Sequence, residues 1–401
     1  MNPHAARGRT SVLVTDAETR PALAVVRSLG RQGHEVQVCS FRRSPLAAAS
    51  RYAAGTHVVS NPLANPQRYV EDLARVVRET GVAYVMPITD SSSTALLPHR
   101  EALAPALVLG PSAASFLAAS DKAGLLALAP QFGIAVPPQT RLDARSAALP
   151  PTLSFPLVVK PHRSASGGQS LTVRHAHDGA TLAAIIDALP DAAFPVLLQQ
   201  RIIGPGIGIF VLRHADQIIA TFAHRRLVEQ PASGGGSAYS ESVAADEVLV
   251  AQVSALLAHL DWEGPAMVEF KVEAATNRAY LMEINGRFWG SLQLAIDSGV
   301  DFPAIWLEHV LDPTLTPTAD PYRTGVRVRS MTNLVDHVAD RLLHTPERLS
   351  VPPDAPPLGW VIGQLVRWHP QNRFETLRSD DPMPFLRDIA QWFQRRVLRR
   401  Y

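Results

Sequence analysis

The first 115 residues alternate short apolar runs with amphipathic stretches, and no other feature of the sequence constrains the fold as strongly. The runs Ser11–Thr15 and Val82–Pro87 have the length of buried strands, while segments 20–30 and 69–80 carry apolar residues at helical spacing. Strand, helix and strand joined by short links predict a parallel, doubly wound α/β sheet. Asp16-Ala17-Glu18 follows the first strand in place of Gly-x-Gly-x-x-Gly, which argues against a nicotinamide dinucleotide site.

The composition favours a soluble intracellular protein. The 401 residues carry a formal charge of +2 and their arginines are scattered, so no nucleic-acid partner is expected. The one cysteine, Cys39, excludes a disulfide scaffold and a cysteine-based zinc site. No run reaches the ~18 apolar residues of a membrane span, and the first residues lack the apolar core of a signal peptide. We therefore expect a cytoplasmic protein.

The rest of the chain has a different organisation. A second unit begins near Ser120, and from Lys160 to Asn285 strands and one or two helices alternate irregularly, which predicts an α+β unit with antiparallel pairing. A Pro/Thr-rich break at 312–321 precedes a C-terminal tail. Within that tail, apolar residues from Phe385 to Val397 recur at helical spacing beside several arginines. This pattern favours a helix packed on the domain over a helix that lies in a membrane interface.

Two alternating runs, 267–272 and 279–285, flank a short polar segment and predict a β-hairpin. Because side chains alternate between the two faces of a strand, Glu269 and Glu283 lie on the polar face. If the turn is symmetric about Thr276, the two carboxylates are directly opposite each other, ~5 Å apart. The apolar face is expected to hold Val268, Phe270, Val272, Tyr280, Met282 and Ile284.

The polar face of this hairpin is suited to a divalent cation. Facing carboxylates repel each other, and a cation between them turns that repulsion into binding. Asn285 shares the face with Glu269 and Glu283, so two carboxylates and an amide oxygen form an all-oxygen set that suits Mg²⁺. Arg287 follows as a permanent charge for an anionic substrate or for charge that develops on a phosphate. The alternative is a solvated hairpin face with incidental glutamates.

Three further segments have features of a nucleotide site. Lys160 ends an apolar strand and precedes a small loop, and the backbone N–H groups of this loop could close over phosphates; the loop includes Ser166, Gly167 and Gly168. A second strand runs through Gln199–Ile202 into a Gly-Pro-Gly bend, where exposed backbone groups could bind an adenine edge. Arg225 and Arg226 precede a Gly/Ser loop and suit a clamp on a γ-phosphate or carboxylate. Each segment taken alone is also compatible with an ordinary turn or linker.

In their order along the chain, these pieces resemble the ATP-grasp superfamily over about residues 120–303. The resemblance implies a doubly wound N-terminal domain followed by an α+β fold whose two subdomains clasp ATP. We expect boundaries at 1–118 for the N-terminal domain, 119–198 for the small subdomain, 199–312 for the central subdomain and 313–401 for an extension. The stretch from Arg225 to Pro231 is similar to the Arg-Arg…Glu-Glu-x-Pro stretch of biotin carboxylase.

The resemblance also implies roles for individual residues. The chain has three lysines, Lys122, Lys160 and Lys271, and all lie within the matching region. Two of them match lysines that contact the phosphates and adenine of ATP. The implied nucleotide-binding residues are Lys122, Lys160, Ser166, Gly167, Gly168, Gln199, Gln200, Arg201 and Ile202. The implied metal ligands are Glu269, Glu283 and Asn285, and the implied catalytic arginines are Arg287, Arg226 and Arg225.

The string from Asn285 to Ser291 looks most like that of carboxylate–amine ligases and of the carbamoyl-phosphate synthase-like branch. It implies an enzyme that uses ATP and one or two Mg²⁺ ions, with Mn²⁺ as a substitute. The implied substrates are a small carboxylate, activated as an acyl phosphate, and an amine, with ADP and phosphate released. The loop after Pro87, which includes Asp90, is a candidate edge of the acceptor pocket, because ligands bind beyond the carboxyl ends of parallel strands.

Three alternatives stay open. A carboxylase or carbamoyl-phosphate synthase-like module would use the same ATP apparatus with bicarbonate. A non-catalytic nucleotide-binding protein would bind ATP without turning it over, and the complete Glu/Glu/Asn set argues against it. A membrane-associated scaffold would rest on the tail helix; membrane contact is otherwise not expected. A homodimer is compatible with the sequence.

Overall fold

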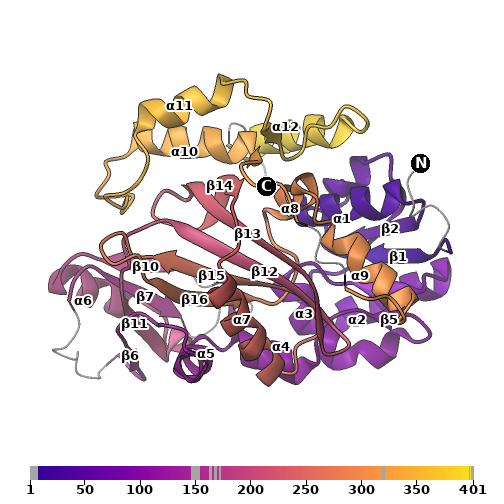
Figure 1. The fold of residues 1–401 in the computed structure, drawn as a ribbon, viewed down its shortest axis with the longest axis horizontal. Coiled ribbons are helices and arrows are strands. Elements are labelled where there is room, and N and C mark those ends of the chain that lie inside the picture. The colour runs from indigo at the N-terminus through magenta and orange to yellow at the C-terminus, as the bar shows by residue number, and fades with distance from the viewer. Residues whose placement is uncertain are drawn as a thin grey trace.

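The computed structural model describes residues 8–145, 154–161, 165–166, 169–170, 173–317, 321–396 and 398. Its N-terminal part is a parallel sheet in the order β3-β2-β1-β4-β5, drawn in indigo and violet in Figure 1. This confirms the doubly wound arrangement that the alternating runs predict. The strands are β1 (Ser11–Val14), β2 (Glu35–Ser40), β3 (Ala53–Val58), β4 (Tyr84–Met86) and β5 (Leu107–Val108). The helices are α1 (Arg20–Arg31), α2 (Pro66–Thr80), α3 (Asp90–Leu96) and α4 (Ala113–Ser120).

Helix α2 shows how local sequence sets the ends of these elements. The Asn65 side chain accepts a hydrogen bond from the backbone N–H of Arg68 at the start of the helix. At its end, Gly81 takes a left-handed conformation with φ of 66°, and its backbone N–H donates a hydrogen bond to the carbonyl of Val77. Glycine is favoured there because a Cβ makes this conformation costly.

Gly81→Ala is therefore expected to lower the free energy of unfolding by about 1 kcal/mol, measured from urea-unfolding midpoints. The matched control is Gly179→Ala at the first position of α6 (Gly179–Ala188), where a Cβ would meet no atom within 4 Å. That control should be neutral or slightly stabilising. Equal losses at the two positions would contradict the argument from backbone conformation.

A four-stranded antiparallel sheet follows, in the order β10-β7-β11-β6. Helix α6 covers it and buries a separate hydrophobic core that includes Leu182, Ile186 and Leu198. Helix α5 (Lys122–Leu128) precedes this sheet, and a small hairpin pairs β8 (Ala165–Ser166) with β9 (Gln169–Ser170). The strands of the sheet are β6 (Gln139–Leu142), β7 (Leu157–Pro161), β10 (Arg174–Ala176) and β11 (Val196–Gln200).

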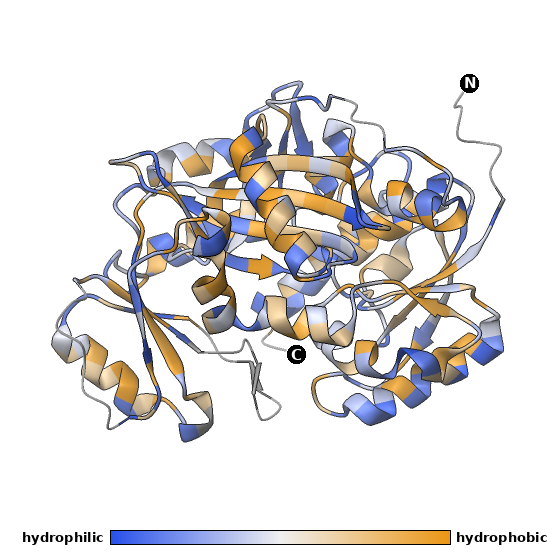
Figure 2. Cartoon of the chain, turned by 60° about the horizontal axis from the view of Figure 1, so that its bottom comes forward, coloured by the Kyte–Doolittle hydropathy of each residue, from blue (hydrophilic) through white to orange (hydrophobic). Residues whose placement is uncertain are grey.

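The central sheet has the order β16-β15-β12-β13-β14-β17-β18. Helix α7 (Glu247–His259) covers one face, and α8 (Leu292–Ser298) and α9 (Phe302–Leu311) lie against the other. Hydrophobic residues dominate the middle strands (Figure 2), because this part of the sheet is covered on both faces. The strands are β12 (Gly206–His214), β13 (Gln217–Gln230), β14 (Gly236–Ser242), β15 (Gly264–Val272), β16 (Ala279–Asn285), β17 (Arg327–Arg329) and β18 (Asn372–Phe374).

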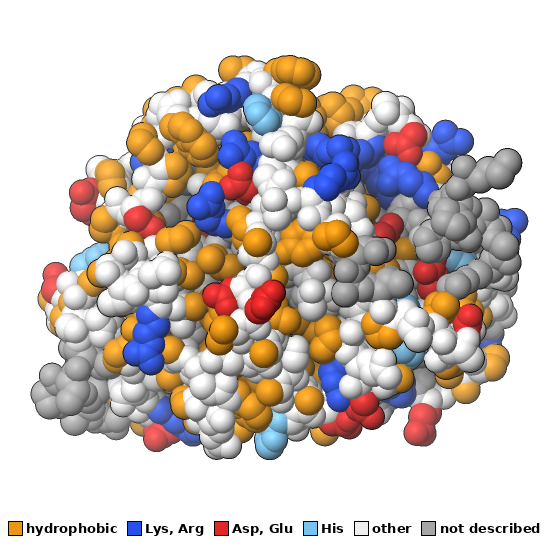
Figure 3. All heavy atoms as spheres, viewed as in Figure 1, with side chains coloured by type: hydrophobic (Ala, Val, Ile, Leu, Met, Phe, Trp, Pro, Cys, Tyr) orange, Lys and Arg blue, Asp and Glu red, His pale blue; other side chains and the backbone are white. Residues whose placement is uncertain are grey.

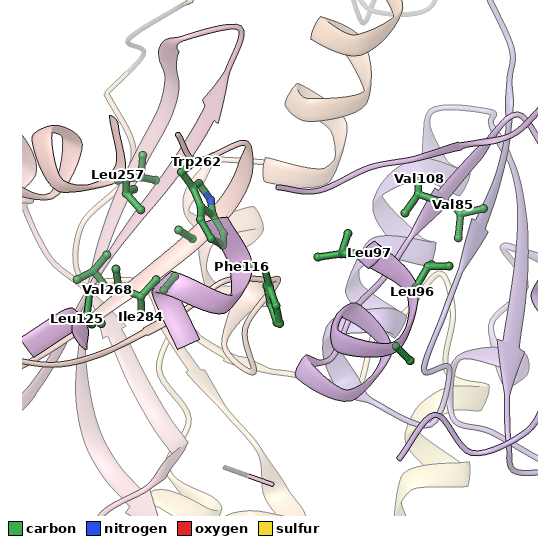
Figure 4. Close-up of a cluster of buried hydrophobic side chains, with 14 of the residues drawn as sticks. Val85, Leu96, Leu97, Val108, Phe116, Leu125, Leu257, Trp262, Val268 and Ile284 are labelled. Atoms are coloured by element: carbon green, nitrogen blue, oxygen red, sulfur yellow. The ribbon is translucent and has the colours of Figure 1, made fainter. Parts of the chain in front are cut away.

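One hydrophobic cluster joins the N-terminal sheet to the central sheet. Phe116 of α4 lies between Leu96 and Leu97 on one side and Trp262 on the other (Figure 4). All four side chains are almost fully buried. The N-terminal domain is thus held against the central sheet by a continuous core, and this contact fixes the position of its loops relative to the hairpin of β15 and β16.

The C-terminal extension builds onto the central sheet. Two of its strands, β17 and β18, continue the sheet beyond β14, and α10 (Met331–Leu343), α11 (Leu358–Val366) and α12 (Met383–Arg396) form the upper layer of Figure 1. Helix α12 packs against α10, with Trp392 Nε1 donating to Asp336 Oδ1 at 2.9 Å. This agrees with a helix packed on the domain. None of the helices in the described ranges is long and apolar enough to span a membrane.

Candidate active site

The hairpin of β15 and β16 places Glu269 directly opposite Glu283, as the symmetry about Thr276 predicts. A β-bulge follows, so that Phe270 pairs with Leu281 instead of Met282. Leu281 is accordingly fully buried, whereas Met282 is only half-buried. The prediction that Met282 belongs to the apolar face is therefore wrong, because the extra residue of the bulge shifts the alternation.

The two glutamates belong to a row that crosses the sheet. Glu269 pairs with Gly208 of β12, and Gly208 pairs with His224 of β13. Directly paired residues share a face, so the row runs Glu283, Glu269, Gly208, His224. A Cβ on Gly208 would lie 2.6 Å from the Phe210 ring and 3.1 Å from the His224 ring. Glycine at this position therefore allows both rings to lie close to the strand.

Both carboxylates have cationic partners. Lys122, the first residue of α5, donates from Nζ to Glu283 Oε2. Arg226 binds both carboxylate oxygens of Glu269, with 2.7 Å between Nη1 and Oε1, and its side chain is only 6% exposed. Burial by itself would raise the pKa of Glu283, but the ammonium of Lys122, followed by that of Lys160, lowers this pKa to about 2. Glu283 is therefore ionised at neutral pH.

The cluster extends to Glu229 and Lys271. Lys271 Nζ lies 3.1 Å from Glu229 Oε1, and Arg226 lies 3.7 Å from the same oxygen. Burial would raise the pKa of Glu229, but the charges of Lys271 and Arg226 hold it below its usual value. The described part of the cluster has one more cation than carboxylates. Its members are Lys122, Lys160, Arg226, Lys271 and Arg287 against Glu283, Glu269, Glu229 and Asp90.

The N-terminal domain reaches this cluster through Asp90. Arg287 Nη2 donates to Asp90 Oδ2 at 3.0 Å and to Asn285 Oδ1 at 2.9 Å. The Asn285 amide in turn donates to Glu283 Oε1 at 3.3 Å. Asp90 lies at the start of α3, beyond the carboxyl end of β4, which is the edge where parallel sheets bind ligands. The loop after Pro87 thus borders this cluster, and its place on the acceptor side stays a prediction.

Lys160 differs from the other two lysines. Burial, together with the charge of Lys122, lowers its pKa to about 8 against the opposing charges of Glu283 and Glu269. Lys122 and Lys271 are paired with carboxylates, whereas Lys160 forms no ion pair with a described residue. Since the ammonium is the acid form, Lys160 is charged below pH 8 and loses its proton as the pH rises through that value. It is a half-buried cation that would be stabilised by an anionic partner.

The lowered pKa predicts unusual reactivity of Lys160. At pH 8 about half of its amine is neutral, so acetic anhydride should modify it about tenfold faster than Lys122, whose pKa is raised through its contact with Glu283. Peptide mass spectrometry resolves this readily because the chain has three lysines. ATP with Mg²⁺ should protect Lys160. Faster modification of Lys122, or no protection by the nucleotide, would contradict the assignment.

The doubled arginine is divided between the two faces of the sheet. Arg225 pairs across the strands with Ile207, which packs on the α7 side, whereas Arg226 faces the glutamates. Arg225 is 47% exposed, and its guanidinium binds Glu241, which also binds Arg327. The expectation that Arg225 contributes to the phosphate clamp is therefore corrected, because neighbouring residues of a strand point to opposite faces.

The strand end at Gln199–Ile202 is held on several sides. Gln199 is buried and donates from Nε2 to Gln139 Oε1 at 2.9 Å. The N–H of Gln200 bonds the carbonyl of Pro138, and the guanidinium of Arg201 bonds the carbonyls of Ser233 and Ser350. In the loop after Lys160, Ser166 belongs to β8, whereas Gly167 and Gly168 lie outside the described residues.

The donor set fits a hard divalent cation. The facing glutamates and the Asn285 amide present the oxygen ligands that Mg²⁺ takes, and Mg²⁺ commonly retains further positions for water and phosphate. Among the described residues there is no group of three or more His, Cys, Asp and Glu that could hold a metal, so thiolate and multi-histidine sites are not available here. A site of two carboxylates and an amide is consistent with an ion that also binds substrate phosphates.

Two contacts near the site were not expected from the sequence. His224 is buried, and its Nδ1 lies 3.0 Å from the hydroxyl of Ser291, just before α8. His337 of α10 bonds the carbonyl of Glu229 through Nδ1 at 2.8 Å, which ties the C-terminal extension to the site. The sequence could have indicated that His224 lies near the site, because His224 shares a strand face with Arg226. No motif in the C-terminal extension could have indicated the contact of His337 with β13.

Part of the sequence and the overall fold are similar to those of known proteins. Residues 193–334 match the model of a family described as "ATP-grasp in the biosynthetic pathway with Ter operon". An L-amino acid ligase from Bacillus licheniformis has a similar structure, with a TM-score of 0.60, 16% identity and coverage of 77% of this chain and 75% of that one. Among curated protein sequences, none matches the chain.

Two further solved structures are similar at comparable levels. N5-carboxyaminoimidazole synthetase from Staphylococcus aureus has a TM-score of 0.60 at 13% identity and covers 82% of this chain and 83% of its own. The biotin carboxylase domain of 2-oxoglutarate carboxylase from Hydrogenobacter thermophilus, solved with MgADP and bicarbonate, has a TM-score of 0.61 at 14% identity, with coverage of 80% and 74%. The chain has the ATP-grasp fold, and its match to the Ter-operon-associated family is limited to residues 193–334.

Proposed function

We propose that the chain is an ATP-dependent ligase that activates a small-molecule carboxylate as an acyl phosphate and joins it to an amine. The observation that carries the proposal is the convergence of Glu269, Glu283 and Asn285 beside the cations Lys122, Lys160 and Arg226. Such a cluster suits a polyanion bound through a metal, because its described cations outnumber its described carboxylates by one and Lys160 has no described carboxylate to offset its desolvation.

The nucleotide end of the site is assigned to the four-stranded sheet and to α5. Lys122 and Lys160, which forms no ion pair with a described residue, would hold phosphate oxygens, while the strand end at Gln199–Ile202 would border adenine. Because the N–H of Gln200 is already bonded to Pro138, adenine recognition there would fall to Ile202 and to carbonyl oxygens. The proposed boundary at 119 separates these elements from the N-terminal domain, whereas the proposed boundary at 199 falls within β11 and assigns the strand end at Gln199–Ile202 to the central subdomain.

Glu269, Glu283 and Asn285 are the residues that would hold Mg²⁺, which when bound neutralises charge on the phosphates. Arg226 and Lys122 neutralise the two glutamates, and in the proposed complex they would be shared between carboxylate and phosphate. Arg287, positioned by Asp90 and Asn285, would stabilise the phosphoryl group during transfer.

The proposed reaction has two steps. A carboxylate oxygen attacks the γ-phosphorus, the bond to the β–γ bridging oxygen breaks, and ADP leaves. The amine nitrogen then attacks the acyl carbon, the bond to the phosphate oxygen breaks, and phosphate leaves as the nitrogen gives up a proton. Binding both reactants in one site raises their effective concentration and keeps water from the acyl phosphate.

Bicarbonate is the second candidate for the activated carboxylate. The similar carboxylase domain from Hydrogenobacter thermophilus was solved with MgADP and bicarbonate, and the ATP half of the proposed site would serve either substrate.

ADP release is the measurement that tests the proposal. Libraries of carboxylates and amines are screened in pairs with Mg²⁺-ATP, and products are identified by mass. A ligase requires both partners for product, whereas ADP release stimulated by bicarbonate alone supports the second candidate. Lys160→Ala serves as the site control. Turnover that this variant leaves unchanged would show that the assigned residues are not the active site.

A further inference from the structure

The C-terminal extension carries an unusual share of exposed hydrophobic side chains. Most of the large hydrophobic residues that are exposed in the described ranges lie beyond residue 340. They include Val366 and Trp368, each about as exposed as a side chain in an unfolded chain, at 84%. Leu342 and Leu343, at the end of α10, are exposed as well. Single exposed hydrophobic residues are ordinary, but a concentration in one region marks a surface for interaction.

Helix α11 differs from a typical surface helix in which of its side chains are exposed. Its only side chain with a hydrogen-bonding group besides that of Trp360 is Gln364, and this residue is 3% exposed. Trp360, Ile362 and Val366 instead reach solvent. Surface helices place apolar residues toward the core and polar residues toward water, so a helix with apolar residues on its outer face lacks a covering partner.

The charged side chains within the segment 355–374 have one sign. Residues 355–374 contain no aspartate or glutamate, whereas Arg367 and Arg373 lie within this segment. Arg367 is exposed between Val366 and Trp368. In Figure 3, hydrophobic side chains form the top edge over α10 and α11, and Lys and Arg side chains gather below that edge. A partner for this face should therefore combine an apolar interior with negative charge at its border.

We propose that the face formed by Trp360, Ile362, Val366, Arg367 and Trp368 docks on an anionic lipid surface. A bilayer that contains acidic lipids offers acyl chains to the aliphatic residues, an interface that suits tryptophan, and phosphate groups for arginine. A second copy of the same face is a less suitable partner, because its residues 355–374 would add further arginines and no carboxylate to pair with them. The proposal is independent of the ligase assignment, and it assigns the contact to α11 in place of the tail helix α12.

The test is flotation of the full-length protein with vesicles. One set is phosphatidylcholine alone, and the other contains phosphatidylcholine and phosphatidylglycerol at 70:30. The acidic vesicles should bind the protein about tenfold more, and the difference should shrink at high salt because surface charges are screened. The double variant Val366→Asp with Trp368→Ser should lose about tenfold or more of this binding.

The matched control is Val248→Asp, since Val248 of α7 is 66% exposed on a different element. It should bind acidic vesicles like the wild type, and thermal melts should show that both variants fold, because all three side chains are exposed. Absent binding to acidic vesicles, or equal binding by the double variant, would overturn the proposal. A dimer in light scattering that only the double variant abolishes, without vesicle binding, would assign the face to a second copy.

Discussion

Glutamine in place of Glu283 is expected to slow ATP-dependent ADP release by about 10²–10³-fold. The substitution keeps the shape of the side chain but removes the charge that pairs with Lys122 and lowers the effective charge of the proposed metal site. Lys122 and Lys160 then repel each other without the carboxylate between them, which weakens the binding of Mg²⁺ as well as phosphoryl transfer. Steady-state ADP release and Mn²⁺ binding by electron paramagnetic resonance measure the two effects separately.

The matched control for this variant is Glu273→Gln in the turn of the same hairpin. Glu273 accepts a hydrogen bond from the Thr276 hydroxyl and forms no ion pair with a described residue. Its substitution should leave ADP release within about twofold of the wild type. Similar losses in the two variants would mean that the hairpin tolerates no change of charge, and the specific role of Glu283 would be lost.

Methionine in place of Arg226 is expected to lower the free energy of unfolding by about 3–5 kcal/mol. Arg226 is buried and binds both oxygens of Glu269, so its removal leaves an uncompensated buried carboxylate and also withdraws charge from Glu229. The loss is measured from urea-unfolding midpoints. It should diminish when Mg²⁺ is added, because a cation in the site restores the missing charge.

Arg225→Met, one residue away, is the control for this prediction. Arg225 is half-exposed, and its partner Glu241 keeps a second ion pair to Arg327 at 2.7 Å. The cost should be about 1 kcal/mol or less. If Arg225→Met destabilised the protein as much as Arg226→Met, the division of the two arginines between the faces of the sheet would be contradicted.

Periodicity predicted the parts of the fold that depend on neighbouring residues. The parallel N-terminal sheet follows from alternation of apolar runs, and the opposition of Glu269 and Glu283 follows from the symmetry of one short turn. The bulge after Glu269 could not be predicted in this way, because the pattern Phe270 to Met282 is compatible with an unbroken ladder. Which of Arg225 and Arg226 faces the site required knowing the register of β13 against β12.

Long-range contacts escaped prediction for a different reason. The contact of Asp90 with Arg287 joins residues of separate domains, and that of His337 with Glu229 joins the extension to the central sheet. The sequence spacing of neither pair indicates a contact, because each contact depends on how folded parts of the chain pack against each other. Helix α11 illustrates the same limit. Its composition is that of a buried helix, and only the structure shows which of its side chains reach solvent.

The convergence of oxygen ligands and cations is tested most directly by a crystal structure with Mn²⁺ and a non-hydrolysable ATP analogue. Anomalous difference density distinguishes Mn²⁺ from water and from lighter ions. The account predicts a Mn²⁺ peak among Glu269, Glu283 and Asn285, with phosphate oxygens on Lys160. A nucleotide bound elsewhere, or a metal peak that none of these three side chains approaches, would contradict it.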